Sequence, residues 1–157
     1  MNSWSEHTGF LRTMIRLFDP SDLESVQRLL SSIPEVVPWS ADDFLLASQR
    51  NFCLRVAEEE ETVSGLVAFR IIGDEAEILN LAVDSRQRRR GIGSRLMEEM
   101  IEACKAAGVK TIFLEVRESN CGARNFYSGM GFTEAGRRGR YYRQPVEDAL
   151  VLTRRVE

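Results

Sequence analysis

The residues with the clearest chemical meaning lie between positions 81 and 96. This stretch reads as an apolar strand, an arginine-rich loop and the start of a helix, with Gly91 and Gly93 at the turn between loop and helix. A helix N-terminus carries unpaired N–H donors and partial positive charge, and glycines leave an anion room to approach. The stretch therefore predicts a phosphate site built from the main-chain N–H groups of residues 89–94.

Two better-known phosphate loops do not fit this spacing. A dinucleotide-binding loop needs GxGxxG, and Leu96 stands at the position of its third glycine. A nucleoside-triphosphate loop needs Gly-Lys followed by Ser or Thr, and the sequence has no such run. On the residues alone, a glycine-rich turn without a ligand remains the other interpretation.

Apolar periodicity predicts the elements that hold this loop in place. Alternation and short turns predict a short strand at 14–18 and then an antiparallel meander at 52–57, 63–72 and 75–83. The period then changes to that of a helix, at 94–107, with Gly108 at its C-terminal end. The rest of the chain predicts a strand at 109–116, a helix at 121–130, and strands that begin at 132 and near 149.

Two helix starts and one crossover complete the expected fold. Ser21 and Glu24 have the spacing of a capping box, and Ser40 with Asp43 suggests a second start. The strand–helix–strand stretch at 75–116 is a crossover, so its two strands should run parallel. We expect an α+β fold with a central mixed, mostly antiparallel sheet and helices on both faces.

The overall composition narrows the classes of protein. The 157 residues suit one domain, which we expect at 14–157 after a flexible extension at 1–13. A net charge of −3 disfavours general nucleic-acid binding. No apolar run approaches the ~20 residues needed to cross a bilayer. The first residues lack the order of a signal peptide, so the expected location is the cytoplasm.

Residues for metal and nucleophilic chemistry are scarce. The three cysteines form no CxxC motif, and His7 is the only histidine. An odd number of scattered cysteines indicates free thiols, and the sequence has no His/Cys cluster for a metal site. A Ser–His–Asp or Cys–His apparatus has almost no material here.

The glycine loop and several later runs resemble one family. Arg88-x-x-Gly91-x-Gly93 is similar to the acetyl-CoA pyrophosphate motif of the GNAT superfamily, normally Q/R-x-x-G-x-G/A. Within it, the chain most resembles the ribosomal-protein alanine N-acetyltransferases. It shares their Leu-Glu-Val-Arg-x-Ser-Asn run, a Tyr followed a few residues later by Gly-Phe, an Arg-Tyr-Tyr run, a late Glu-Asp-Ala and an early Pro-Trp-Ser. The resemblance covers about residues 14–156.

The resemblance implies a GNAT-like fold with acetyl-CoA as co-substrate and no metal. In such a fold the strand ending at Val83 splays from the strand ending at Arg117 and exposes main-chain groups. The groups implied to hold acetyl-CoA are this strand end, the loop, the helix start and two residues further along: Leu81, Ala82, Val83, Arg88, Arg89, Arg90, Gly91, Ile92, Gly93, Ser94, Asn120 and Tyr127.

The resemblance also implies two catalytic side chains. Glu115 matches a general base that takes a proton from the acceptor ammonium, directly or through water, and Tyr127 matches the acid that protonates the departing CoA thiolate. Other interpretations stay open: Glu115 could pair with an arginine on a wet strand face, and Asn120 could simply cap a helix. Tyr127 could be a packed aromatic residue.

The acceptor side is implied less closely. Trp39, Tyr141 and Tyr142 would flank a peptide N-terminus if the resemblance holds, with ordinary packing as the alternative. The implied reaction is direct attack by a primary amine, the N-terminal α-amine of a protein such as a ribosomal protein. A small-molecule amine (a polyamine, an aminoglycoside or an amino acid) is the first alternative, and a non-catalytic acyl-CoA-binding domain is the second.

Overall fold

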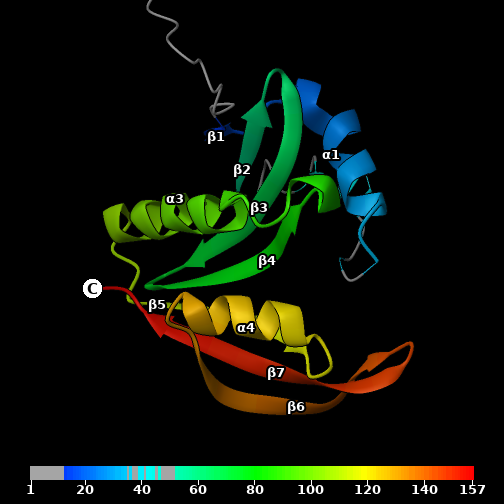
Figure 1. The fold of residues 1–157 in the computed structure, drawn as a ribbon. Coiled ribbons are helices and arrows are strands. Elements are labelled where there is room, and N and C mark those ends of the chain that lie inside the picture. Colours follow the sequence, from blue (N-terminus) through cyan, green and yellow to red (C-terminus); the bar gives the residue numbers. More distant parts are fainter. Residues whose placement is uncertain (1–12, 35, 37–38, 41, 45, 47–51) are drawn as a thin grey trace, which may run out of the picture.

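The computed structural model describes residues 13–34, 36, 39–40, 42–44, 46 and 52–157. Seven strands form one sheet in the order β1-β2-β3-β4-β5-β7-β6 (Figure 1). The strands are β1 (Met14–Leu17), β2 (Phe52–Glu59), β3 (Thr62–Ile72), β4 (Glu75–Val83), β5 (Thr111–Arg117), β6 (Thr133–Arg143) and β7 (Val146–Arg155). The β4–β5 pair is parallel and the other pairs are antiparallel, as the crossover at 75–116 predicted.

Helices cover both faces of the sheet, and each face has its own apolar core. The helices are η1 (Pro20–Asp22), α1 (Leu23–Ser31), η2 (Ser85–Gln87), α3 (Ile92–Ala106) and α4 (Cys121–Gly129). α1 buries its apolar side against β2, β3 and β4 on one face. α3 and α4 pack on the other face, where Figure 1 shows them lying roughly side by side. The α+β prediction is therefore confirmed.

The start of the first helix differs from the prediction. The capping box is formed by Asp19 and Asp22: the Ser21 N–H donates to Asp19 at 2.9 Å, and the Asp19 N–H donates to Asp22 at 2.8 Å. The predicted box of Ser21 and Glu24 is wrong. Pro20 explains the shift, because proline lacks an N–H and suits the first helical position, which makes the preceding residue the cap.

The second predicted helix start is confirmed. The Ser40 N–H donates to the Asp43 carboxylate at 2.7 Å, and the Asp43 N–H donates to the Ser40 hydroxyl at 3.2 Å. The two side chains therefore cap each other's main chain, as a capping box requires.

Two strands are longer than their apolar patterns indicated. The strand expected at 52–57 continues to Glu59, and the last strand begins at Val146 instead of near Ala149. In both cases the extra residues include carboxylates held by arginines, Glu58 by Arg16 and Glu147 by Arg117. Apolar alternation cannot reveal a strand end that is neutralised by a distant cation.

Gly65 sets how closely α3 approaches the sheet. A Cβ atom at Gly65 would lie 3.0 Å from a side-chain carbon of Leu96, 3.1 Å from the Ala82 carbonyl oxygen and 3.2 Å from the Ile92 side chain. Contacts that short would force the helix outward. Gly65 thus seats the first turn of α3 against β3 and β4, a role that the sequence patterns did not indicate.

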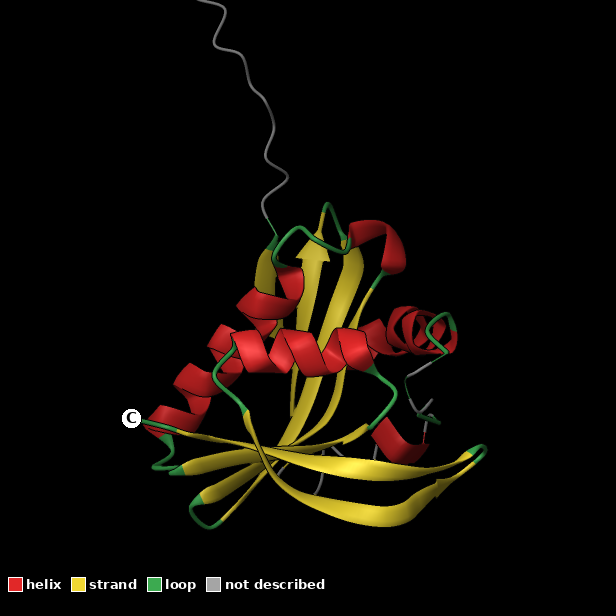
Figure 2. Cartoon of the chain, turned by 60° about the horizontal axis from the view of Figure 1, so that its bottom comes forward, coloured by secondary structure: helices red, strands yellow, loops and turns green. Residues whose placement is uncertain are grey.

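The parallel pair opens soon after it forms. β4 and β5 pair only from Glu75–Glu77 to Thr111–Phe113, whereas β5 pairs with β7 along its whole length. Beyond Glu77 the edge of β4 leaves β5, so the predicted splay is confirmed. Figure 2 shows β6 and β7 as a long curved pair whose hairpin projects to the right, beyond the rest of the sheet.

Candidate functional site

The first turn of α3 has the features of the predicted anion site. Gly91 precedes the helix with φ 78°, a left-handed conformation that favours glycine, and no side chain caps the helix. A Cβ atom at Gly91 would meet nothing within 4 Å, so the space in front of the turn is open. A Cβ atom at Gly93 would lie 3.5 Å from the Phe126 ring. Ser94 follows in the first turn of α3, and the Ile92 side chain is buried beneath that turn.

The three arginines of the loop have different surroundings. Arg90 bonds to Gln87 and forms an ion pair with the buried Glu59 at 3.3 Å, which ties the loop to β2. The Arg88 Nε lies 3.5 Å from the Val83 carbonyl oxygen. Arg89, at φ 64°, is exposed and has no ion pair or hydrogen bond among the residues that the structure describes. Arg89 is therefore the arginine most free to meet an anion.

The strand end at residues 81–83 presents main-chain groups to the splay. The Asp84 N–H donates to the Ser64 carbonyl at 2.8 Å, so Asp84 and, two residues earlier, Ala82 face β3. Because successive residues of a strand point their N–H groups to opposite sides, those of Leu81 and Val83 face the opening toward β5. Among the described residues, β5 pairs with β4 only as far as Glu77, so these two donors have no strand partner in the opening, while Ala82 lies between them and pairs with β3.

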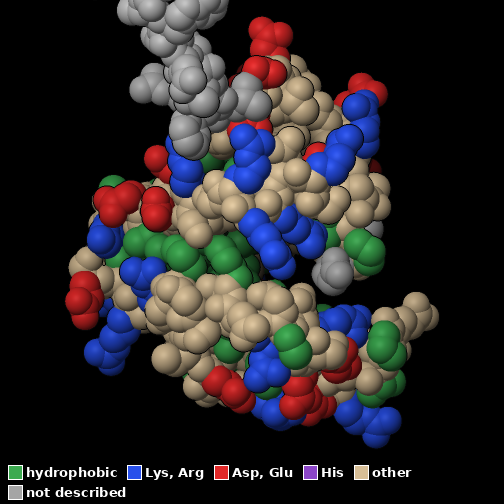
Figure 3. Space-filling view, viewed as in Figure 1, with side chains coloured by type: hydrophobic (Ala, Val, Ile, Leu, Met, Phe, Trp, Pro, Cys, Tyr) green, Lys and Arg blue, Asp and Glu red, His purple; other side chains and the backbone are tan. Residues whose placement is uncertain are grey.

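Figure 3 shows an apolar strip between α3 and α4 and basic side chains at the end where α3 begins. The strip lies over the first of the two cores, to which both helices contribute. This layout places apolar surface and positive charge side by side, as a ligand with an apolar arm and phosphate groups would need.

Asn120 and Tyr127 lie on the same helix but in different environments. The Asn120 side chain caps α4 by accepting from the Ala123 N–H at 3.2 Å. Tyr127 is 7% exposed and packs edge-on against Phe126 and Phe132, with ring centroids 5.2 and 5.4 Å away. Burial raises the pKa of Tyr127 above its usual 10.0, so the phenol stays neutral.

The Tyr127 hydroxyl reaches the surface despite the burial of its ring. Among the described residues, no buried polar side-chain atom lacks a hydrogen-bond partner. Tyr127 has no hydrogen bond to any of those residues, so its oxygen must retain contact with solvent. A neutral donor at the end of a buried ring is the geometry of a general acid, and also that of an aromatic residue at the edge of a core.

Glu115 points away from α4, as its strand position predicted. Leu114 and Val116 are buried beneath α3 and α4, and Glu115 lies on the opposite face of β5. Its carboxylate forms an ion pair with Arg138, whose Nε lies 2.8 Å from one of its oxygens. Glu115 and Tyr127 therefore flank β5, the strand that borders the splay, from its two faces.

The β6–β7 pair supplies the surroundings of Glu115. Tyr141 hydrogen-bonds to Glu115, and this bond is the main reason why the pKa of Tyr141 is raised. The Tyr141 and Tyr142 rings meet edge-on at 5.1 Å, and the Arg117 guanidinium lies 4.1 Å from the centre of the Tyr142 ring. The predicted tyrosine pair thus lies beside Glu115, together with two arginines that the sequence reading did not single out.

Trp39 contacts a different part of the molecule from Glu115 and the tyrosine pair. Its ring packs on Phe44 at 5.1 Å, and both belong to the core beneath α1. Its role beside an acceptor stays a prediction. Of the helix predicted to start at Ser40, residues 45 and 47 lie outside the described residues.

Metal-binding clusters and membrane-spanning helices are both absent from the described part of the chain. Within it, no group of three or more His, Cys, Asp or Glu side chains is arranged to hold a metal ion. No helix in that part has the length and apolar character needed to cross a membrane.

Known proteins resemble this chain in both sequence and fold. The model of the acetyltransferase (GNAT) family matches residues 14–132. The [ribosomal protein bS18]-alanine N-acetyltransferases of Salmonella typhimurium and Escherichia coli K12 are 34% and 32% identical over 117 residues, which cover 73% of this chain and 79% of each relative. Among solved structures, the ribosomal-protein-S18-alanine N-acetyltransferase of Escherichia coli superposes with a TM-score of 0.84 at 28% identity, covering 93% of this chain and 95% of that one.

A second solved structure is similar in fold and in sequence. Ard1 from Thermoplasma volcanium superposes with a TM-score of 0.83 at 31% identity, covering 92% of this chain and 98% of that one. The family match spans the glycine loop, Glu115 and Tyr127, and the splayed strands are those that the resemblance implied. The chain belongs to the acetyltransferase (GNAT) family.

Proposed function

We propose that this acetyltransferase transfers the acetyl group of acetyl-CoA to the N-terminal α-amine of a protein, with the N-terminal alanine of a small-subunit ribosomal protein as the favoured acceptor. The observation that carries the proposal is the opening between β4 and β5, with the bare first turn of α3 at one end and Glu115 and Tyr127 on either face of β5. An acceptor of this kind places the reaction in the cytoplasm.

The donor side follows from main-chain geometry. The first turn of α3 offers unpaired N–H groups to the pyrophosphate, and Arg89 adds a free positive charge beside it. The N–H groups of Leu81 and Val83 can pair with the pantetheine amides, as an extra strand would. Val83, nearest the loop, is placed to donate to the thioester oxygen as negative charge develops there. Asn120, which caps α4, would contact acetyl-CoA in the same opening between β4 and β5.

The chemistry needs one base and one acid. In our proposal, Glu115 takes a proton from the acceptor ammonium, and the free amine attacks the thioester carbon. The C–S bond breaks, the sulfur takes a proton from the Tyr127 hydroxyl, and the new amide gives its remaining extra proton back toward the tyrosine, so one proton in total goes to Glu115 and on to solvent. Because burial keeps Tyr127 protonated, its donation must accompany C–S cleavage.

The acceptor side favours a peptide over a small amine. Tyr141 is 48% exposed and stands beside Glu115, together with the partly buried Tyr142 and the ion pair of Arg117 with Glu147. An open aromatic and charged wall of this kind offers contacts to several residues of a chain. A small amine would use only the carboxylate.

An acceptor panel with acetyl-CoA tests the proposal. Alanine-initial peptides should be acetylated at the α-amine, as read by mass spectrometry, with kcat/KM well above that for polyamines, aminoglycosides and free amino acids. Faster turnover of the small amines would overturn the protein acceptor. Binding of acetyl-CoA without turnover of any amine would leave only the non-catalytic acyl-CoA-binding alternative.

A Tyr127→Phe variant tests the acid. We expect kcat to fall by about 10²-fold, while acetyl-CoA binding stays nearly intact, since only the hydroxyl is lost. The matched control is Tyr142→Phe, which removes a hydroxyl from the acceptor side and leaves the packing around α4 unchanged. Unchanged turnover in Tyr127→Phe would remove this residue from the mechanism.

A further inference from the structure

The carboxylate proposed as the base already holds a cation. The Arg138 Nε lies 2.8 Å from one oxygen of Glu115, and the Glu115 side chain is 15% exposed while that of Arg138 is 60% exposed. A carboxylate with so little solvent is costly to leave unpaired, whereas an exposed guanidinium gives up a single partner at little cost. The pair is therefore asymmetric: Glu115 needs a cation, and Arg138 does not need Glu115.

We propose that Arg138 is a positioning residue that neutralises Glu115 in the free enzyme and is displaced when the acceptor ammonium binds. The inference rests on the proposed function, in which Glu115 receives the proton of that ammonium. One cation then replaces another, and Glu115 stays paired at every stage. Arg138 must leave before proton transfer, because a guanidinium on the carboxylate opposes the uptake of a proton.

The strand around Arg138 is built so that this side chain can move. Arg138 pairs with Ala149 and Tyr142 pairs with Glu147, so the three residues 139–141 of β6 stand opposite Asp148 alone. Within this bulge Arg140 has φ 54°, and its N–H donates to Asp148 at 2.8 Å. The ladder is already interrupted beside Arg138, so the main chain next to it can shift without breaking a regular strand pair.

A second resting place for the guanidinium is already present. The Arg138 Cζ lies 5.6 Å from the centre of the Tyr141 ring, within the range of a cation–π contact. A guanidinium that leaves Glu115 can therefore remain on this ring, with which it is already in contact. Tyr141 also hydrogen-bonds to Glu115, so arginine, tyrosine and carboxylate form one small exchange site.

The neighbouring arginine shows the opposite arrangement. Arg137 forms ion pairs with both Glu118 at 2.8 Å and Asp148 at 2.9 Å. Two carboxylates hold that guanidinium between β6, β7 and the turn before α4. Arg138 pairs with a single carboxylate, so it can be displaced more easily than Arg137.

Peptide binding measured directly tests the exchange. Isothermal titration of the CoA-bound full chain would compare an alanine-initial peptide with the same peptide acetylated at its N-terminus, which has no ammonium. In Arg138→Gln, the Kd of the free-amine peptide should fall by about two- to fivefold, the strength of an exposed ion pair, because the peptide no longer competes with the arginine. The Kd of the acetylated peptide should not change.

Two further variants keep the test sharp. Arg138→Lys retains a cation and should bind both peptides as the wild type does. Arg143→Gln removes an exposed charge from the same strand, where Arg143 has no ion pair among the described residues, and should change neither Kd. Weaker or unchanged binding of the free-amine peptide to Arg138→Gln, or equal gains for both peptides, would overturn the exchange.

Failure of the exchange and failure of the proposed function have different signatures. If the wild type acetylates alanine-initial peptides but the affinities do not follow the pattern above, only the exchange is wrong. If the wild type acetylates no peptide α-amine at all, the proposed function is wrong. The split between acceptor KM, which should fall in Arg138→Gln, and acetyl-CoA KM, which should not, provides a second kinetic readout.

Discussion

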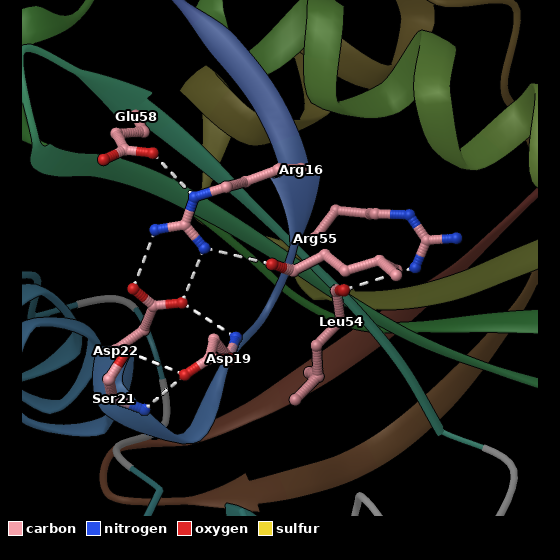
Figure 4. A network of polar contacts seen from close by, with 8 residues as sticks. Arg16, Asp19, Ser21, Asp22, Leu54, Arg55 and Glu58 are labelled. Carbon is pink, nitrogen blue, oxygen red and sulfur yellow. Dashed lines mark hydrogen bonds and ion pairs between the residues drawn. The ribbon is translucent and has the colours of Figure 1, made fainter.

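The two ends of the molecule use the same pair of side chains, an arginine and a carboxylate, in different ways. At the N-terminal end, Arg16 donates to both oxygens of Asp22 at 2.8 Å and to Glu58 at 2.6 Å (Figure 4). It also donates to the Leu17 carbonyl at 3.0 Å. At the C-terminal end, Arg138 meets one oxygen of Glu115 and remains 60% exposed.

The difference lies in how many partners each guanidinium has. Arg16 joins β1, β2 and the turn before α1, and its side chain is 28% exposed against 9% for Asp22 and 19% for Glu58. Planar, bidentate geometry of this kind fixes the positions of the elements that it joins. A single bond from an exposed arginine fixes little and leaves its carboxylate available to another cation. The first network is thus structural, and the second is suited to function.

Glu115→Gln should give the largest effect, and it should be on activity. Loss of the base lowers kcat by about 10³-fold, which corresponds to about 4 kcal/mol of barrier. The free energy of unfolding should change by less than about 0.5 kcal/mol, because the partner arginine is exposed. Steady-state kinetics and urea titration of the same preparation would measure both.

Glu58→Gln is the reciprocal control in the N-terminal network. It removes a carboxylate from Arg16, so it should lower stability and leave kcat unchanged. A loss of activity in the folded Glu58→Gln protein, or a large loss of stability in Glu115→Gln, would contradict the division between the two networks.

Asp22→Ala should give the next largest effect, on stability. It removes a bidentate ion pair and the acceptor of the Asp19 N–H, so the free energy of unfolding should fall by about 2–3 kcal/mol. The matched control is Glu24→Ala in the first turn of the same helix. Glu24 pairs with Arg28 on the surface, with both side chains more than 70% exposed, and its loss should cost less than about 0.5 kcal/mol. Equal decreases in the free energy of unfolding in the two variants would show that the Arg16 network does not stabilise the fold.

The same contrast explains what the sequence could predict. The strand at 75–83 and the helix ending before Gly108 were predicted almost to the residue, because period and cap are local properties. The glycine loop was recognisable because its glycine spacing and the left-handed turn at Gly91 are local properties of the main chain. Glu115 was placed on the correct face of β5 by alternation alone.

The arginine networks were not predictable in this way. Arg16 and Glu58 are 42 residues apart, and they meet through the register of β1 on β2. Arg138 reaches Glu115 only because the bulge in β6 and the pairing of β7 with β5 set its position. Periodicity says which face a residue occupies, but not which residue from another strand lies beside it. Gly65 was missed for the same reason, since its neighbours come from α3 and β4.

Low pH should reduce the stability that the charged Asp22 contributes through its ion pair with Arg16. The hydrogen bonds from Arg16 are the main reason why the pKa of Asp22 lies below its usual 3.8. A carboxyl group whose pKa is lowered by folding adds stability above its unfolded pKa, and this stability is lost as the pH falls through the folded pKa. The difference in unfolding free energy between wild type and Asp22→Ala should therefore be constant near neutrality and shrink below about pH 4, by at most about 1.4 kcal/mol per pH unit.

The comparison of two variants isolates this small effect from other carboxylates. Glu147 and Asp148 also have lowered pKa values, because they accept hydrogen bonds from Ser119 and Arg140. Their contribution to acid unfolding is common to the wild type and Asp22→Ala, so it cancels in the difference. Urea titrations of both proteins between about pH 7 and pH 3 would measure it. If this difference in unfolding free energy stayed constant down to about pH 3, the ion pair of Arg16 with the charged Asp22 would not be the source of the stability. The Arg16 network would then stabilise the protein through packing of the arginine stem alone.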